Sequence, residues 1–139
     1  MATILFEEHR ALASERKSLA IVEPILFQLK DFLGIQDDKF YNIMIAVTEA
    51  VNNALNHGNK LNPEKVVTFD VIANNSEIHI KVKDQGNGFN PDEVADCLEP
   101  ENLLKSSGRG VFIIKELMDY AEFVSDSNGT QVTMRYFWA

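Results

Sequence analysis

Hydrophobic residues in the first quarter of the chain recur at helical spacing. Leucine and valine return at intervals of three, four or seven residues, which predicts a helix over residues 12–33. Pro24 lies inside this run, where it either kinks the helix or divides it. Gly34 is expected to end the helix. The apolar segment before it, residues 3–6, indicates a short edge strand.

A second run with helical spacing spans about residues 37–56 and ends at Gly58. Its apolar stripe consists of Phe40, Ile43, Met44, Val47, Val51 and Ala54. Asparagine and proline follow at Asn62 and Pro63, so residues 59–64 are expected to form a loop.

Hydrophobic and polar residues then alternate in two segments, residues 67–71 and 78–82. Alternation of this kind predicts strands with one buried face and one solvated face. Asn74-Asn75-Ser76 lies between the two segments and indicates a hairpin connection. From residue 84 to residue 108 the periodicity disappears, and so long an irregular stretch in a compact domain is usually functional or mobile.

The last part of the chain returns to regular patterns. A third helix is predicted from about residue 109 to residue 120, followed by strands over residues 121–125 and 130–137. The element order is therefore strand, helix, helix, hairpin, long loop, helix, hairpin. This order predicts one α+β domain over residues 1–139: a two-layer sandwich in which three helices cover one face of a mixed, mostly antiparallel sheet.

Composition limits the classes of function. With 139 residues, of which 45% are hydrophobic, the chain can build one ordinary domain with a core, whereas two domains would be cramped. The formal net charge of −8 gives it no electrostatic reason to bind nucleic acid or an anionic membrane. An anionic ligand would therefore be held by local cations, backbone amides or a metal ion.

The cellular compartment follows from what the sequence lacks. The single cysteine, Cys97, excludes an internal disulfide and indicates a reducing compartment. The N-terminal residues lack the basic stretch and apolar run of a signal peptide. No window approaches the ~18 apolar residues that a membrane-spanning helix needs. We therefore expect a cytoplasmic protein.

Polar side chains concentrate on one face of the second predicted helix. At about 100° per residue, four of them lie within about 80° of Glu49. These four are Asn52, Asn53, Asn56 and His57. A solvated helix face usually carries better helix formers than asparagine, so the carboxamides are expected to serve a ligand. On this segment alone, a simple solvated face stays open.

Two glycine-containing segments complete the candidate chemistry. Asp84, Gly86 and Gly88 form an Asp-x-Gly-x-Gly turn, in which glycine permits close approach of a ligand to the backbone. The carboxylate of Asp84 can accept a hydrogen bond from an exocyclic amine. Taken alone, ordinary turn chemistry is the more frequent explanation of such a segment.

The other segment, Ser107-Gly108-Arg109-Gly110, opens the third helix, where free amides and the helix dipole favour anions. Lys105 and Arg109 add two cations there. N-capping by the serines is the simpler alternative.

Several other kinds of site are excluded or disfavoured. His9 and His79 have no zinc-ligand spacing with each other or with His57. The sequence contains no nucleophile elbow, no Walker-type phosphate loop and no protein-kinase His-Arg-Asp or Asp-Phe-Gly signature.

Taken in order, the three segments resemble the N box and the two glycine boxes of the Bergerat-fold ATPases. This superfamily contains histidine-kinase catalytic domains, DNA gyrase subunits and heat-shock chaperones. Within it, the chain is most similar to the small anti-sigma-factor serine/threonine kinases, on the run of residues 100–110 and the helix segment 112–119. The resemblance extends over roughly residues 5–137.

The resemblance implies a role for each matching position. Glu49 would activate the attacking hydroxyl, and Asn53 would be the Mg²⁺ ligand. Asp84 would read the adenine amine. The remaining nucleotide-binding residues would be Asn52, Asn56, His57, Gly86, Gly88, Lys105, Gly108, Arg109 and Gly110. The long loop between the glycine boxes would be the ATP lid.

The resemblance also implies a function. The chain would use ATP and Mg²⁺ to phosphorylate a serine or threonine of an anti-sigma antagonist, and would bind a sigma factor or an analogous regulator. Members of this group often form homodimers, to which the Thr3–Phe6 strand would contribute. The main alternative is an ATP-binding partner-switch module without kinase activity. A histidine-kinase catalytic domain and a nucleotide-free scaffold are weaker alternatives. The serine/threonine kinase and the ATP-binding module both require Glu49 and Asp84 to face a shared cleft.

Overall fold

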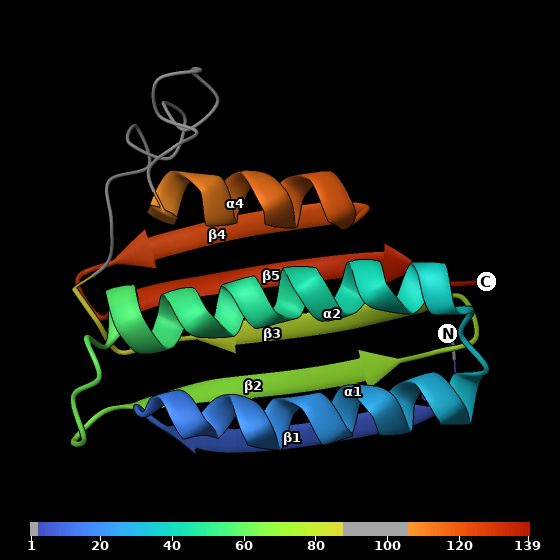
Figure 1. The fold of residues 1–139 in the computed structure, drawn as a ribbon, viewed down its shortest axis with the longest axis horizontal. Helices are drawn as coiled ribbons and strands as arrows, with labels where there is room; N and C mark the ends of the chain where they lie inside the picture. The colour runs from blue at the N-terminus through green and yellow to red at the C-terminus, as the bar shows by residue number, and fades with distance from the viewer. Residues whose placement is uncertain (1–2, 88–105) are drawn as a thin grey trace.

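Figure 1 shows the computed structural model of the chain, in which residues 3–87 and 106–139 are described. In chain order its elements are β1 (Phe6–Ala13), the 3₁₀ turn η1 (Arg16–Ser18), α1 (Leu19–Leu33), α2 (Asp37–Asn52), the π-helical segment η2 (Asn53–Gly58), β2 (Val66–Ala73), β3 (Glu77–Lys83), α4 (Ser106–Leu117), β4 (Tyr120–Asp126) and β5 (Gly129–Phe137).

The five described strands form one sheet in the order β1-β2-β3-β5-β4. Each neighbouring pair is antiparallel, so the expectation of a mixed sheet is not met by the described strands. The three helices α1, α2 and α4 lie side by side over one face of this sheet (Figure 1). The predicted α+β class, with three helices on one face, is confirmed.

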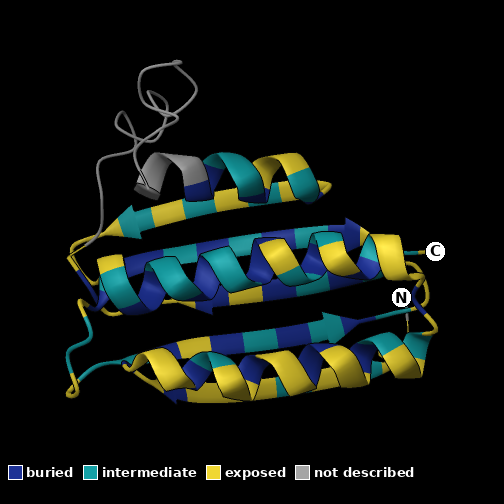
Figure 2. Ribbon diagram, viewed as in Figure 1, coloured by how far each residue is buried: buried dark blue, intermediate teal, exposed yellow. Residues whose placement is uncertain are grey.

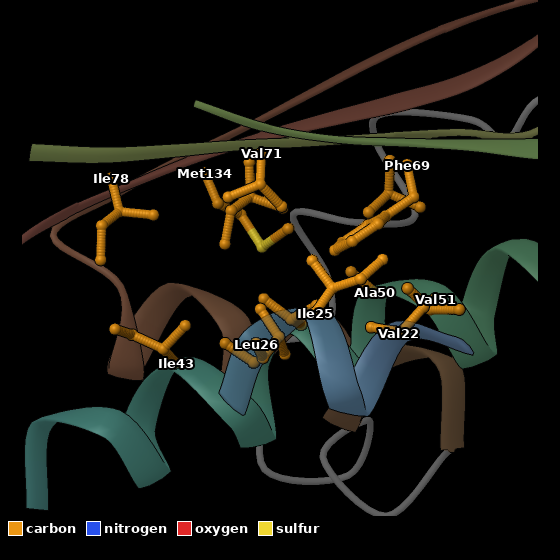
Figure 3. Close-up of a cluster of buried hydrophobic side chains, with 14 of the residues drawn as sticks. Val22, Ile25, Leu26, Ile43, Ala50, Val51, Phe69, Val71, Ile78 and Met134 are labelled. Carbon is orange, nitrogen blue, oxygen red and sulfur yellow. The ribbon is translucent and has the colours of Figure 1, made fainter. Parts of the chain in front are cut away.

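The core lies between the helix layer and the sheet. In Figure 2 the buried residues of α1 and α2 recur at helical spacing, whereas buried and exposed residues alternate along the strands. Figure 3 shows the contact between the layers, with Val22, Ile25 and Leu26 from α1, Ile43, Ala50 and Val51 from α2, and Phe69, Val71, Ile78 and Met134 from the sheet. The opposite face of the sheet is covered by no described helix.

The prediction for the N-terminal region was wrong in its boundaries. The first helix begins at Leu19 and not at Leu12, because Leu12 lies in β1 opposite Val67 and is buried there. Charged residues on this edge strand hid its length from the hydrophobic pattern. Pro24 lies inside α1, and the helix continues through it.

The later helices also differ from their predicted bounds. The α-helical geometry of α2 ends at Asn52, and the chain continues as a π-helix in which the Asn59 amide donates to Ala54 O at 2.8 Å. Helix α4 spans Ser106–Leu117 and not residues 109–120, so Ser106 to Gly108 belong to its first turn. The expected lid falls mainly on residues 88–105, outside the described residues.

No helix within residues 3–87 and 106–139 combines the length and apolar character needed to cross a membrane. The predicted hairpin at Asn74 is confirmed. The Asn74 side-chain oxygen accepts hydrogen bonds from the amides of Ser76 and Glu77 at 2.9 and 2.8 Å.

A histidine joins the edge strand to its neighbour on the face of the sheet away from the helices. The ring of His9 contacts Glu7 through Nε2 at 2.8 Å and Asp70 through Nδ1 at 2.6 Å. Hydrogen bonds to Glu7 and then to Asp70 raise the pKa of His9 above its ordinary value of 6.5. The charged imidazolium therefore stabilises the β1–β2 contact below about pH 6.5, and this contribution is lost as pH rises through the folded-state pKa.

We expect Asp70→Asn to lower the pKa of His9, because it removes one of the two carboxylates that favour the protonated ring. An NMR titration of the His9 ring in both proteins measures the change. The side chain is 54% exposed, so the effect on overall stability should be small. Equal midpoints in the two titrations would show that the Asp70 contact does not set the pKa.

Candidate functional site

The start of α4 packs against the polar face of α2 through a glycine. Glu49 and Asn53 are four residues apart and share this face. A Cβ placed on Gly110 would lie 2.9 Å from Asn53 Nδ2 and 3.0 Å from Glu49 Oε2. The lack of a side chain at Gly110, which is buried, therefore allows the helix backbone to approach both polar groups. The first and third of the predicted segments thus lie in contact.

The Asp84 carboxylate lies at the other end of the site and is held by the backbone. Its residue is 5% exposed, and its Oδ1 accepts hydrogen bonds from the amides of Gly86 at 2.9 Å and Thr130 at 3.0 Å. The Asp84 amide in turn donates to Thr130 O at 3.0 Å. Both described hydrogen bonds to the carboxylate use Oδ1. Its Oδ2 lies against Gly58, where an added Cβ would be 2.1 Å away.

Glycines bring the Asp84 turn against the end of η2. A Cβ on Gly86 would lie 2.1 Å from Gly58 O, and one on Gly129 would lie 2.2 Å from Asp84 O. Gly129 also has a φ of +135°, which residues with side chains rarely adopt. Residues with side chains could not pack this closely. The second predicted segment is therefore in contact with the first, through Gly58.

The three segments thus meet along one helical element, α2 continued by η2. Glu49 and Asn53 lie beside Gly110 on α4, and Gly58 lies beside Asp84. The nine steps from Glu49 to Gly58 would span about 13 Å at the α-helical rise, and span less because the second part is π-helical. The arrangement has a carboxylate near each end and suits an elongated ligand.

The remaining polar residues of this element lie near or within its π-helical part. Asn56 donates through Nδ2 to Asn52 O at 2.9 Å, so its carboxamide is engaged within its own helix. His57 is exposed, and Asn52 is half-buried. Asn56 and His57 lie beyond Asn53, where the chain leaves α-helical geometry, so the spacing of about 100° per residue does not apply to them. π-helical segments of this kind are frequent at functional sites.

Part of the predicted set lies outside the described residues. Gly88 and Lys105 belong to the stretch 88–105, as does most of the expected lid. Gly108 and Arg109 lie in the first turn of α4, where only the course of the backbone is described.

The structure adds residues that the sequence patterns did not single out. Gly58 and Thr130 hold the Asp84 turn from two sides, and Asn59 is buried directly after η2. The sequence pattern predicts a loop at Asn59. The one feature of the sequence that could have indicated a role for Asn59 is its position immediately after the polar face of the helix.

A hollow of about 480 Å³ opens beside the same turn but on its other side. It is lined by Val66, Thr68, Lys83, Gln85, Gly86, Asn87, Ser127 and Asn128. Thr68 and Lys83 pair across the sheet and are exposed on the face away from the helices. Gly86 belongs to both this hollow and the helix-side site, whereas neither Glu49 nor Asn53 lines the hollow.

Sequence comparisons agree on the family. A family model described as a histidine kinase-like ATPase domain matches residues 16–136. The Anti-sigma F factor of Bacillus cytotoxicus is 37% identical over 100 residues, which cover 68% of this chain and 67% of that protein. The Anti-sigma F factor of Clostridium perfringens is 36% identical over 103 residues, which cover 70% of this chain and 72% of that protein.

Two solved structures share the fold. The RsbU and RsbW domains of Rv1364c from Mycobacterium tuberculosis match with a TM-score of 0.71 at 16% identity, over 95% of this chain and 32% of that one. The histidine kinase domain of the blue-light activated histidine kinase from Erythrobacter litoralis EL346 matches with a TM-score of 0.53 at 18% identity, over 84% of this chain and 63% of that one. The chain belongs to the histidine kinase-like ATPase domain family, within the group that contains the anti-sigma F factors.

Proposed function

We propose that the chain is an ATP-dependent protein serine/threonine kinase of a partner switch. It would phosphorylate an anti-sigma antagonist and, in another complex, bind and inhibit a sigma factor or an analogous regulator. The observation that carries the proposal is the contact of Gly110 with Glu49 and Asn53, which brings a carboxylate to the start of α4. The anti-sigma F factor relatives support the choice of partners.

Each end of the site has a distinct task in this proposal. Asp84 Oδ2 accepts a hydrogen bond from the 6-amino group of adenine, while Oδ1 stays with the backbone amides. The phosphates lie toward the start of α4, where the backbone amides of a first helical turn and the helix dipole favour negative charge. Lys105 and Arg109, which are close to the first turn of α4 in sequence, would supply cations for them. Such local donors are needed because the chain as a whole is acidic.

At the phosphate end, the carboxylate and the carboxamide divide the chemistry. Glu49 accepts the proton of the substrate hydroxyl and orients its oxygen. Asn53 is the residue that would hold Mg²⁺ through its side-chain oxygen, and the proximity of Glu49 Oε2 makes this corner suitable for a cation. When bound, Mg²⁺ neutralises phosphate charge. Positioning and charge neutralisation are most of what phosphoryl transfer needs from a protein.

The proposal includes a cytoplasmic location and a homodimer. A partner protein would be reached in a reducing compartment, which fits the lone cysteine. Strand β1 is an edge of the sheet, and edge strands offer unpaired backbone groups to a second chain.

The alternative is a module that binds ATP and switches partners without transferring phosphate. Glu49 favours the kinase, because binding alone needs no general base beside the helix start. The deciding experiment is incubation of the protein with γ-labelled ATP, Mg²⁺ and its cognate antagonist. We expect label on a serine or threonine of the antagonist. ATP binding without any transfer would favour the module.

ATP binding itself is expected to stabilise the fold. At a ligand concentration of about 100 times Kd, a single site raises the free energy of unfolding by roughly 2.7 kcal/mol. Urea denaturation with and without Mg²⁺ and ATP measures this difference. GTP at the same concentration should stabilise less, because its base lacks the 6-amino group that Asp84 would read. No stabilisation by ATP at millimolar concentration would contradict the proposal.

A further inference from the structure

Asn59 is a buried asparagine that uses both polar atoms of its side chain. The residue is 1% exposed and follows directly after η2. Its Nδ2 donates to Ser14 Oγ at 2.9 Å and to Val66 O at 3.0 Å. Its Oδ1 accepts the amide of Gln85 at 2.7 Å. One side chain therefore links the end of β1, the start of β2 and the turn after β3.

The hydrogen bond to Gln85 fixes the peptide that follows Asp84. The Gln85 side chain reinforces it, since its Oε1 accepts the Val66 amide at 2.8 Å. On the other side of Asp84, the Thr130 amide holds Oδ1. Oδ1 is also held by the Gly86 amide, which belongs to the same turn, and Asn59 anchors that turn to the end of η2.

The close packing of glycines makes this anchor important. Gly86 approaches Gly58 O so closely that no side chain fits between them, and Asp84 Oδ2 lies against Gly58. Asn59 is the next residue after Gly58, so its side chain ties down the same corner that its backbone forms. A rotation of the Asp84–Gly86 turn would move Oδ2 away from this corner and would also break the 2.7 Å bond to Asn59.

We propose that Asn59 is a positioning residue for purine recognition: through the Gln85 amide it holds the Asp84 turn in the orientation that reads the 6-amino group of adenine. The inference rests on the proposed function, in which Asp84 contacts the base. It assigns to Asn59 an effect on base discrimination, beyond the stability that any satisfied buried carboxamide contributes.

The test compares ATP with purine riboside triphosphate, which lacks only the 6-amino group. Calorimetry with the full chain gives the ratio of the two dissociation constants for each variant. We expect the wild-type protein to prefer ATP by roughly tenfold or more, the effect of a hydrogen bond to a charged group. Asn59→Ala should lower this ratio, because the turn loses its anchor at the Gln85 amide while its other hydrogen bonds remain.

Two further variants separate positioning from stability. Ser14→Ala removes another partner of Asn59 in the same buried network and leaves the Gln85 contact in place. It should lower the stability of the protein but keep the wild-type ratio of the two dissociation constants. Asn59→Ser retains a polar group yet is too short to reach the Gln85 amide, and it replaces Asn59→Ala if that variant does not fold. Asn59→Ser should likewise show a weaker preference for ATP over purine riboside triphosphate.

The possible outcomes lead to different conclusions. Loss of discrimination in the Asn59 variant, with discrimination kept in Ser14→Ala, supports the inference. Full discrimination in the Asn59 variant overturns it and leaves the proposed function standing. Equal loss in both variants also overturns it, since that is the result of general destabilisation. A wild-type protein without any preference for ATP overturns the proposed role of Asp84 itself, and the inference with it.

Discussion

Replacing Glu49 by alanine is expected to abolish phosphoryl transfer and to leave ATP binding largely intact. The carboxylate lies beside Asn53 at the start of α4, where it would accept the hydroxyl proton of the substrate protein. Loss of a positioned general base typically lowers the rate by about 10²- to 10⁴-fold. Single-turnover transfer to the antagonist measures the rate, and calorimetry measures the ATP affinity.

Glu49→Gln is the sharper variant, because it keeps the size of the side chain and removes only the basic group. It should be as inactive as Glu49→Ala. Glu23 is exposed on α1, so Glu23→Ala is a matched control that should transfer phosphate at the wild-type rate. Retained activity in Glu49→Gln would exclude Glu49 as the base, and weak ATP binding in that variant would indicate a role in binding instead.

Replacing Gly86 by alanine is expected to damage both stability and nucleotide binding. The new Cβ would lie 2.1 Å from Gly58 O and 2.7 Å from Gly58 C, which are backbone atoms that no side-chain rotation can move away. The turn would have to shift as a whole. Overpacking of this kind typically lowers stability by about 1–3 kcal/mol. The same shift would displace the Asp84 carboxylate, so ATP affinity should fall in the protein that still folds.

Gly34→Ala is the matched control for this glycine. An added Cβ there meets no atom within 4 Å, but Gly34 has a φ of +70° at the end of α1. Its replacement should lower stability by about 1 kcal/mol through backbone strain alone and leave ATP affinity unchanged. Urea denaturation and calorimetry on both variants distinguish strain from displacement. Wild-type stability in Gly86→Ala would show that the turn tolerates more space than the structure indicates.

The sequence patterns predicted the layers and the order of the elements because these depend on local periodicity. The apolar stripe of α2 and the alternation in β2 are strong over many residues, and their hydrophobic side chains lie in the core or pack against it. The first strand was underestimated because its charged residues lie at a sheet edge, where alternation is weak. Only pairing with β2 shows that Leu12 belongs to it.

The candidate site was predictable in its residue types but not in its geometry. The clustering of Glu49 and Asn53 follows from helical spacing alone. The departure into η2 could not be predicted, because no propensity distinguishes a π-helix at Asn53. The contact of Asp84 with Gly58 and the burial of Asn59 are tertiary features that join segments more than 20 residues apart.

The close approach of α4 to Glu49 would let the position of this helix control the proposed kinase activity. Gly110 places no side chain between the two helices, so a displacement of α4 would directly change its contact with the Glu49 carboxylate. The first turn of α4 is also where the phosphates are proposed to lie. Nucleotide binding and the position of the proposed general base would then be coupled through α4. A partner protein that displaces α4 would stop phosphoryl transfer while the nucleotide stays bound.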